Sequence, residues 1–136
     1  GAHAMTDVTG FGLAGHLREM LTPAHFSASC QLHDVPLLPG VTDLIQKGVE
    51  STLAPSNRQA ETVFRFEGER QPSQLPKEQA AAYATLFDPQ TCGGLLIAMP
   101  QEKMDEWQEL ADKRGQFWSS FGRIHRQGKQ TEIHWS

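Results

Sequence analysis

The sequence contains little cysteine, no long apolar run and no excess of positive charge. Its two cysteines, Cys30 and Cys92, lie far apart and show no CxxC or Cys/His metal spacing. We therefore expect two reduced thiols in a cytoplasmic protein, not a disulfide framework or a zinc site. No apolar segment approaches the roughly 18 residues of a membrane span, and no signal peptide is recognisable. These absences predict a chain that does not enter a membrane.

The charge balance argues against a broad surface for nucleic acid. Twelve basic and sixteen acidic side chains give a net charge of −4, and no basic stripe accompanies the tryptophans and phenylalanines. The composition, 38% apolar and 21% charged over 136 residues, is typical of one soluble globular domain. We therefore expect residues 1–136 to form a single domain without a nucleic-acid partner.

Hydrophobic patterning predicts interspersed helices and strands. Leu13, Leu17 and Leu21 recur at helical spacing after Thr9, a candidate N-cap. By similar patterns, helices are expected over 11–21, 41–47, 76–87 and 101–113, and strands over 28–32, 62–66 and 95–99. The helix over 101–113 is expected to turn inward its apolar residues Met104, Trp107, Leu110 and Ala111. A hairpin is expected from 122–126 and 131–135 around a turn at 127–130, 49–59 is expected to be a loop, and 95–99 a buried strand. The fold class predicted is α+β, a two-layer sandwich with a mixed or antiparallel sheet and helices on one face.

The peptide Thr6–Leu13 combines a carboxylate, two threonines and two glycines just before a helix. A helix N-terminus offers free N–H groups and partial positive charge, glycines let the backbone approach a ligand, and a carboxylate can hold Mg²⁺. The composition thus allows a metal–phosphate site. Asp7 and Thr9 are equally consistent with ordinary helix caps, so the residues alone leave both interpretations open.

A second polar peptide, Asp88–Leu96, ends in a glycine pair before an apolar run. On its own it is consistent with a simple helix-to-strand connection in which glycines supply positive φ. Cys92 resembles a nucleophile in this peptide, but the sequence places no histidine to activate it, so a bystander role is expected.

Together, TDVTGFGLAGHL near the start and DPQTCGGLLIA further along resemble the two signature segments of the C-terminal domain of selenophosphate synthetases (selenide, water dikinases). The segment STLAPSNR, at Ser51–Arg58, also resembles a loop of that family. Cys92 stands where the family usually has serine, and Pro55 lies in a segment that is commonly richer in glycine. The resemblance covers nearly the whole chain and implies the fold of an AIR synthase C-terminal domain.

The resemblance also implies an activity. The family makes selenophosphate from selenide and ATP in a Mg²⁺-dependent reaction that releases AMP and orthophosphate. Its catalytic cysteine or selenocysteine, its lysine and its glycine-rich stretch belong to an N-terminal ATP-binding domain whose motifs are not found here. We therefore expect this chain to be part of a longer protein, to carry no catalytic residue and to be inactive by itself. The full-length protein is expected to be a homodimer.

Among the site residues, Asp7 matches the family aspartate that binds Mg²⁺, and thereby ATP, together with carboxylates of the N-terminal domain. The resemblance extends less specifically to four residues expected to line the active site, which are Thr6, Thr9, Asn57 and Thr91. His16, on the first predicted helix, is expected to pack or to act on the site through another side chain.

Two further interpretations stay open. The chain is also compatible with another ATP-dependent enzyme of the AIR synthase-related superfamily, such as a thiamine monophosphate kinase or a purine-biosynthesis enzyme. It is equally compatible with a non-catalytic scaffold or dimerisation module.

Overall fold

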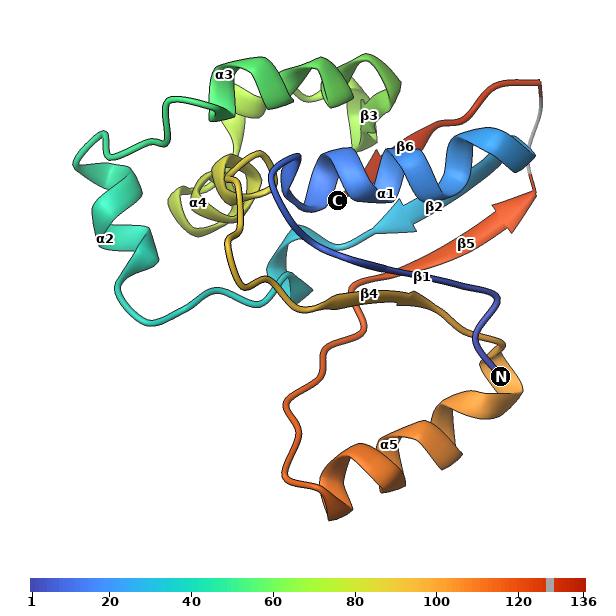
Figure 1. Ribbon diagram of the computed structural model, residues 1–136. Helices are drawn as coiled ribbons and strands as arrows, with labels where there is room; N and C mark the ends of the chain where they lie inside the picture. Colours follow the sequence, from blue (N-terminus) through green and yellow to red (C-terminus); the bar gives the residue numbers. More distant parts are fainter. Residues whose placement is uncertain (127–128) are drawn as a thin grey trace.

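A computed structural model describes residues 1–126 and 129–136 and contains helices and two sheets (Figure 1). The strands are β1 (Ala4–Asp7), β2 (Phe26–Cys30), β3 (Phe64–Phe66), β4 (Leu95–Ala98), β5 (Gly122–Arg126) and β6 (Ile133–Trp135). The α-helices are α1 (Gly12–Leu21), α2 (Val41–Gln46), α3 (Ala54–Asn57), α4 (Lys77–Thr85) and α5 (Met104–Lys113). Short 3₁₀ helices are η1 (Thr22–Ala24), η2 (Leu32–Asp34), η3 (Arg58–Val63), η4 (Glu67–Glu69), η5 (Pro72–Gln74) and η6 (Gln101–Lys103). The predicted α+β class is confirmed.

The larger sheet has the strand order β3-β6-β2-β5. Strand β2 is parallel to β6 and antiparallel to β5, and β6 is parallel to β3, so the sheet is mixed. The predicted hairpin between β5 and β6 is therefore wrong, because β2 lies between the two strands. Two residues of its expected turn, Gln127 and Gly128, lie outside the described part of the chain. The hairpin pattern was a local signal, whereas each of the two strands pairs with β2, which lies far away in sequence.

One face of this sheet forms the core, because side chains alternate between faces along each strand. Ala28 of β2 lies opposite Ile133 of β6, which lies opposite Phe64 of β3, and all three are buried. The next row along the same strands, which is polar and more exposed, consists of Ser29, His134 and Arg65. Leu17 and Leu21 of α1 are buried in the same hydrophobic cluster as the apolar row.

A cluster of aromatic side chains packs in the core beside α4. The ring of Phe64 lies 5.9 Å from that of Phe87 and 5.6 Å from that of Trp135, and Tyr83 packs edge-on against Phe87 at 5.2 Å. Such tilted and edge-on pairs add to the free energy gained from burial alone. The end of α4, which leads into the second signature peptide, is thereby anchored to the sheet.

Three local expectations are wrong. The predicted loop over 49–59 contains the short helix α3. Strand β4 is not buried on both faces, since Leu96 is buried while Leu95 is 60% exposed. On α5, only Ala111 of the expected inward residues is buried, and Leu110 is exposed. In the described part of the chain, no helix combines the length and apolarity that crossing a bilayer requires.

Candidate functional site

The two signature peptides lie side by side, although they are far apart in sequence. Strands β1 and β4 form an antiparallel ribbon in which Asp7 pairs with Leu95 (Figure 1). Beyond the ribbon, the Val8 N–H donates to the Gly94 carbonyl at 3.0 Å, and the Gln90 N–H donates to the Thr9 carbonyl at 3.0 Å. We call this contact region, formed by residues 6–13 and 86–95, the signature junction.

Two glycines make the close approach at the junction possible. Gly12 has φ +68°, and a Cβ there would lie 2.6 Å from the Leu86 carbonyl oxygen. That same carbonyl accepts a hydrogen bond from the Ala14 N–H at 2.9 Å. A Cβ on Gly93 would overlap the Val8 carbonyl oxygen. The glycines are therefore required by backbone contact between the peptides, and not only by local turns.

Asn57 bridges the junction from α3. Its Nδ2 group donates to the Gly10 carbonyl at 2.8 Å and to the Phe87 carbonyl at 2.9 Å. One amide therefore joins a backbone group of the first signature peptide to the residue just before the second. The structure places this predicted lining residue at the site, with its NH₂ group occupied by backbone, so it holds the site together.

Arg58 lies next to Asn57 and contacts the same side of the signature junction. The sequence did not identify it as a site residue. Its guanidinium pairs with Glu50 at 3.1 Å and Glu61 at 3.0 Å, and lies 4.7 Å from the Phe87 ring centroid. Tyr83 donates its hydroxyl proton to Glu61 at 2.7 Å. Burial, and then the hydrogen bond to Glu61, raise the pKa of Tyr83, so this hydroxyl remains a donor. The i,i+3 spacing of Arg58 and Glu61 is the one signal by which sequence could have found the group.

Asp7 ends β1 as an exposed side chain. In the part of the chain that the structure describes, its carboxylate makes no hydrogen bond or ion pair, and no group of three His, Cys, Asp or Glu side chains is arranged to hold a metal. Neither Asp7 nor Thr9 caps α1, whose N-cap is Phe11 without a side-chain hydrogen bond. The capping interpretation of both residues is therefore wrong.

Thr9 instead contacts a histidine. Its Oγ1 lies 3.1 Å from His16 Nε2, and His16 Nδ1 lies 3.3 Å from a carboxylate oxygen of Glu19. His16 is buried, and its ring packs 5.7 Å from that of Phe11. Thr9 is thus linked to α1 through the side chain of His16, in the middle of that helix. This position fits both expectations for His16, which were packing and action on the site through another side chain.

The remaining predicted residues lie at the rim. Thr6 is half-buried on β1, and its hydroxyl donates to the Asp7 carbonyl at 3.2 Å. A small cavity of about 260 Å³ beside it is lined by Ala4, Met5, Thr6, His16, Glu19 and Met20. Thr91 and Cys92 are exposed on the turn before β4, and Cys92 is not bonded to the buried Cys30. The structure brings Thr6, Asp7, Thr9 and Asn57 to the junction and leaves Thr91 on its solvent side.

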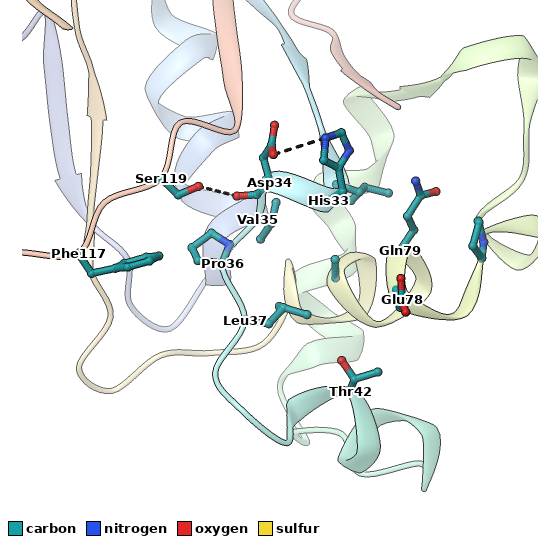
Figure 2. Close-up of a pocket in the computed structure, with 13 residues that line it drawn as sticks. His33, Asp34, Val35, Pro36, Leu37, Thr42, Glu78, Gln79, Phe117 and Ser119 are labelled. Carbon is teal, nitrogen blue, oxygen red and sulfur yellow. Dashed lines mark hydrogen bonds and ion pairs between the residues drawn. The ribbon is translucent and has the colours of Figure 1, made fainter. Parts of the chain in front are cut away.

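A larger depression of about 760 Å³ lies elsewhere, between η2, α4 and the segment before β5 (Figure 2). Its lining includes Pro36, Leu37, Gln79 and Phe117 and none of the predicted site residues. Figure 2 also shows Ser119 donating its hydroxyl to the Asp34 carbonyl, at 2.7 Å. The predicted site residues are therefore separate from this depression.

Comparison with known proteins places the chain in a family. The family model described as "AIR synthase related protein, C-terminal domain" matches residues 1–134. The selenide, water dikinase of Shewanella baltica is 41% identical over 112 residues, which cover 82% of this chain and 29% of that protein. The selenide, water dikinase of Geobacter metallireducens is 37% identical over 123 residues, covering 90% and 34% respectively. The chain thus spans about a third of the curated relatives it matches.

A solved structure shows the same fold. Thiamine-monophosphate kinase from Stenotrophomonas maltophilia superposes with a TM-score of 0.56 over 97% of this chain and 31% of that one, at 16% identity. This likeness establishes the fold alone. The chain belongs to the AIR synthase related family, of which it is a C-terminal domain, and within that family it is similar in sequence to the selenide, water dikinases.

Proposed function

We propose that this chain is the C-terminal domain of an ATP- and Mg²⁺-dependent selenide, water dikinase, which makes selenophosphate from selenide and ATP and releases AMP and orthophosphate. The observation that carries the proposal is the exposed Asp7 carboxylate at the signature junction, which makes no hydrogen bond or ion pair in the described part of the chain. The identity of 37–41% to proteins of that name supports the substrate assignment.

The residues fit one part of a magnesium–phosphate site. Mg²⁺ usually takes one or two protein carboxylates and completes its octahedron with phosphate oxygens and water. Asp7 supplies one carboxylate, and α1, which begins five residues further along the chain, has no side chain capping its N-terminus. Bound there, the metal would neutralise charge on the phosphate oxygens during phosphoryl transfer. The other carboxylates must come from outside this chain.

The same reasoning defines the partners. Phosphoryl transfer needs metal-binding carboxylates from more than one segment, and the chain matches about a third of its relatives' length. We therefore infer an N-terminal ATP-binding domain as the partner of this one. From the family resemblance we further propose a homodimer as the full-length assembly and the cytoplasm as the location. The exposed apolar side chains on the outer face of the β1–β4 ribbon, Met5 and Leu95, suit such a domain contact.

The first test concerns the chain alone. Because one carboxylate cannot hold Mg²⁺–ATP strongly, we expect the purified 136-residue chain to show no ATP turnover, with or without selenide. Release of AMP or phosphate would be followed by ³¹P NMR. Sustained turnover by the chain would contradict the assignment of the reaction to a composite site.

The second test concerns Asp7 in the full-length protein. We expect Asp7→Asn to reduce selenide-dependent AMP formation by at least about a hundred-fold, because the neutral amide cannot balance the charge of the metal. Asp43→Asn, at an exposed position on α2, is the matched control. Near-normal AMP release by Asp7→Asn would remove Asp7 from the site.

A further inference from the structure

We propose that Arg58 is a positioning residue of the candidate site, which holds Phe87 and, through it, the backbone of the segment that carries Asp7. This inference rests on the proposed function, since it concerns how the Asp7 carboxylate is placed in the same metal–phosphate site. Arg58 acts through other residues and not on a ligand, because its guanidinium is already paired with two carboxylates of this chain.

Phe87 is held by two consecutive residues. The Arg58 guanidinium carbon lies 4.7 Å from the centroid of the Phe87 ring, within the range of a cation–π contact. The side chain of Asn57 donates to the Phe87 carbonyl at 2.9 Å. Phe87 is fully buried, and its ring also packs against the rings of Phe64 and Tyr83. The ring and the carbonyl group of one residue are therefore both fixed from the same short segment.

The guanidinium of Arg58 is itself held in one orientation. Its two terminal nitrogens pair with different carboxylates, Glu61 at 3.0 Å and Glu50 at 3.1 Å. The same Glu61 oxygen accepts the hydroxyl proton of Tyr83 at 2.7 Å. A single exposed ion pair contributes little to stability. A planar guanidinium that pairs with two carboxylates and lies over an aromatic ring has a defined plane, which the ammonium group of a lysine does not reproduce.

Backbone hydrogen bonds on both sides of Phe87 reach the first signature peptide. On the side before it, the Leu86 carbonyl accepts from the Ala14 N–H at 2.9 Å. On the side after it, the Gln90 N–H donates to the Thr9 carbonyl at 3.0 Å. A displacement of Phe87 would therefore be passed to the first turn of α1 and to the segment just before that helix.

Asp7 depends on this backbone for its position. In the described part of the chain its carboxylate makes no hydrogen bond or ion pair, so no other side chain holds it in place. Its backbone pairs with Leu95, and the next residue, Val8, donates to the Gly94 carbonyl at 3.0 Å. A functional group must be placed to within about 0.5 Å, and a misplacement of about 1 Å costs up to roughly a hundred-fold in rate. Loss of the Arg58 contact should therefore slow the reaction more than it weakens substrate binding.

The first measurement is amide hydrogen exchange in the purified chain, followed by NMR. We expect Arg58→Lys, which keeps the charge but loses the planar group, to speed exchange of the Gln90 amide about ten-fold relative to the Gln31 amide at the end of β2. Arg65→Lys is the matched control, because Arg65 also pairs with a carboxylate, Glu132 at 3.1 Å, but lies on β3. It should leave this ratio unchanged. No change in the ratio for Arg58→Lys, whether both amides or neither exchanges faster, would overturn the proposal.

The second measurement is the rate of selenide-dependent AMP formation by the full-length protein. We expect Arg58→Lys to lower kcat about ten-fold and to change KM for ATP less than about two-fold, because the inferred N-terminal domain supplies most of the ATP contacts. Arg65→Lys should keep the wild-type kcat and KM. Glu61→Gln, which keeps an acceptor oxygen for Arg58 and Tyr83, should lose less activity than Glu61→Ala.

The outcomes separate the two proposals. If Arg58→Lys leaves kcat unchanged in an active full-length protein, the positioning role is wrong and the proposed function stands. If the wild-type full-length protein forms no AMP from selenide and ATP, the proposed function is wrong, and the role of Arg58 toward Asp7 is wrong with it.

Discussion

The signature junction and helix α5 differ in how well the apolar pattern of the sequence predicts which residues are closely packed. The junction is built from polar and glycine-rich peptides, yet its backbones approach so closely that a Cβ on Gly12 or Gly93 would overlap a carbonyl group. Helix α5 has a clear amphipathic pattern, yet Leu110 is 41% exposed and Ala111 is the one buried residue of the helix. Figure 1 shows α5 set apart from the larger sheet.

The contrast teaches that apolar periodicity predicts a helix but not the surface that covers it. At the junction, stability comes from backbone hydrogen bonds and from a bridging amide, which require particular partners far away in sequence. On α5, the apolar stripe is set by local spacing and can form a helix without being buried.

The largest expected effect separates two adjacent glycines of the junction. We expect Gly93→Ala to lower the free energy of unfolding by about 4 kcal/mol, because the added methyl group collides with the Val8 carbonyl. Gly94→Ala, which has no neighbour within 4 Å of the added Cβ, should change it by no more than about 0.5 kcal/mol. Urea denaturation followed by circular dichroism measures both. Equal losses would mean that the close approach does not exist in solution.

A second pair of variants compares the core with α5 directly. Leu21→Ala, at a side chain 1% exposed on α1, should cost about 3 kcal/mol through lost burial and the cavity left behind. Leu110→Ala on α5 should cost less than about 1 kcal/mol, and alanine loses no helix propensity in either case. The comparison is made from the urea concentrations at the unfolding midpoints, with the same dependence of the unfolding free energy on urea concentration for both variants. A loss at Leu110 as large as that at Leu21 would show that α5 is packed as its pattern predicts.

The smallest effect concerns the two thiols. Burial raises the pKa of Cys30 from 9.0 to about 12, which lowers its thiolate fraction near neutral pH about a thousand-fold. We expect an aromatic disulfide reagent to label one thiol, Cys92, in the native chain and both in denaturant. Cys92→Ser is the control and should leave no fast-reacting thiol. Rapid labelling of Cys30 in the native state would show that β2 opens readily.

The same pKa shift predicts lability at alkaline pH. Because the folded state holds the Cys30 proton more tightly than the unfolded state, this contribution is complete below pH 9 and is lost as pH rises toward 12, by about 1.4 kcal/mol per pH unit. Cys30→Ala should flatten this part of the stability profile. The raised pKa of Tyr83 acts in the same direction, so some alkaline slope should remain in that variant.

Local patterns predicted much of the secondary structure and little of the pairing. The helices expected over 11–21 and 41–47 match α1 and α2 within a residue, because their apolar spacing and their stop signals, Pro23 and Gly48, are local. The expected hairpin at the C-terminal end was wrong because β2, from the first third of the chain, pairs with both strands. Nothing in a local window encodes that insertion.

The candidate site shows the same division. Resemblance to a known family identified Asp7, Thr9, Asn57 and Thr91, and their roles toward a ligand stay predictions. The hydrogen bonds from Asn57 to Gly10 and Phe87 depend on where α3 meets the junction, and the contact of Thr9 with His16 depends on where α1 meets it. Arg58 was not predicted as a site residue because its contact with Phe87 exists only in the folded chain.

The sequence by itself determined the family, the mixed α/β class and the two signature peptides, because motif wording and periodicity are properties of neighbouring residues. Only the tertiary structure decided that the peptides touch, that the Thr9 hydroxyl contacts His16 and does not cap α1, and that Ala111 is the one fully buried residue of the apolar stripe on α5. The physical reason is that burial and hydrogen-bond partners are set by contacts between distant segments, which outweigh the small free energies of local preference.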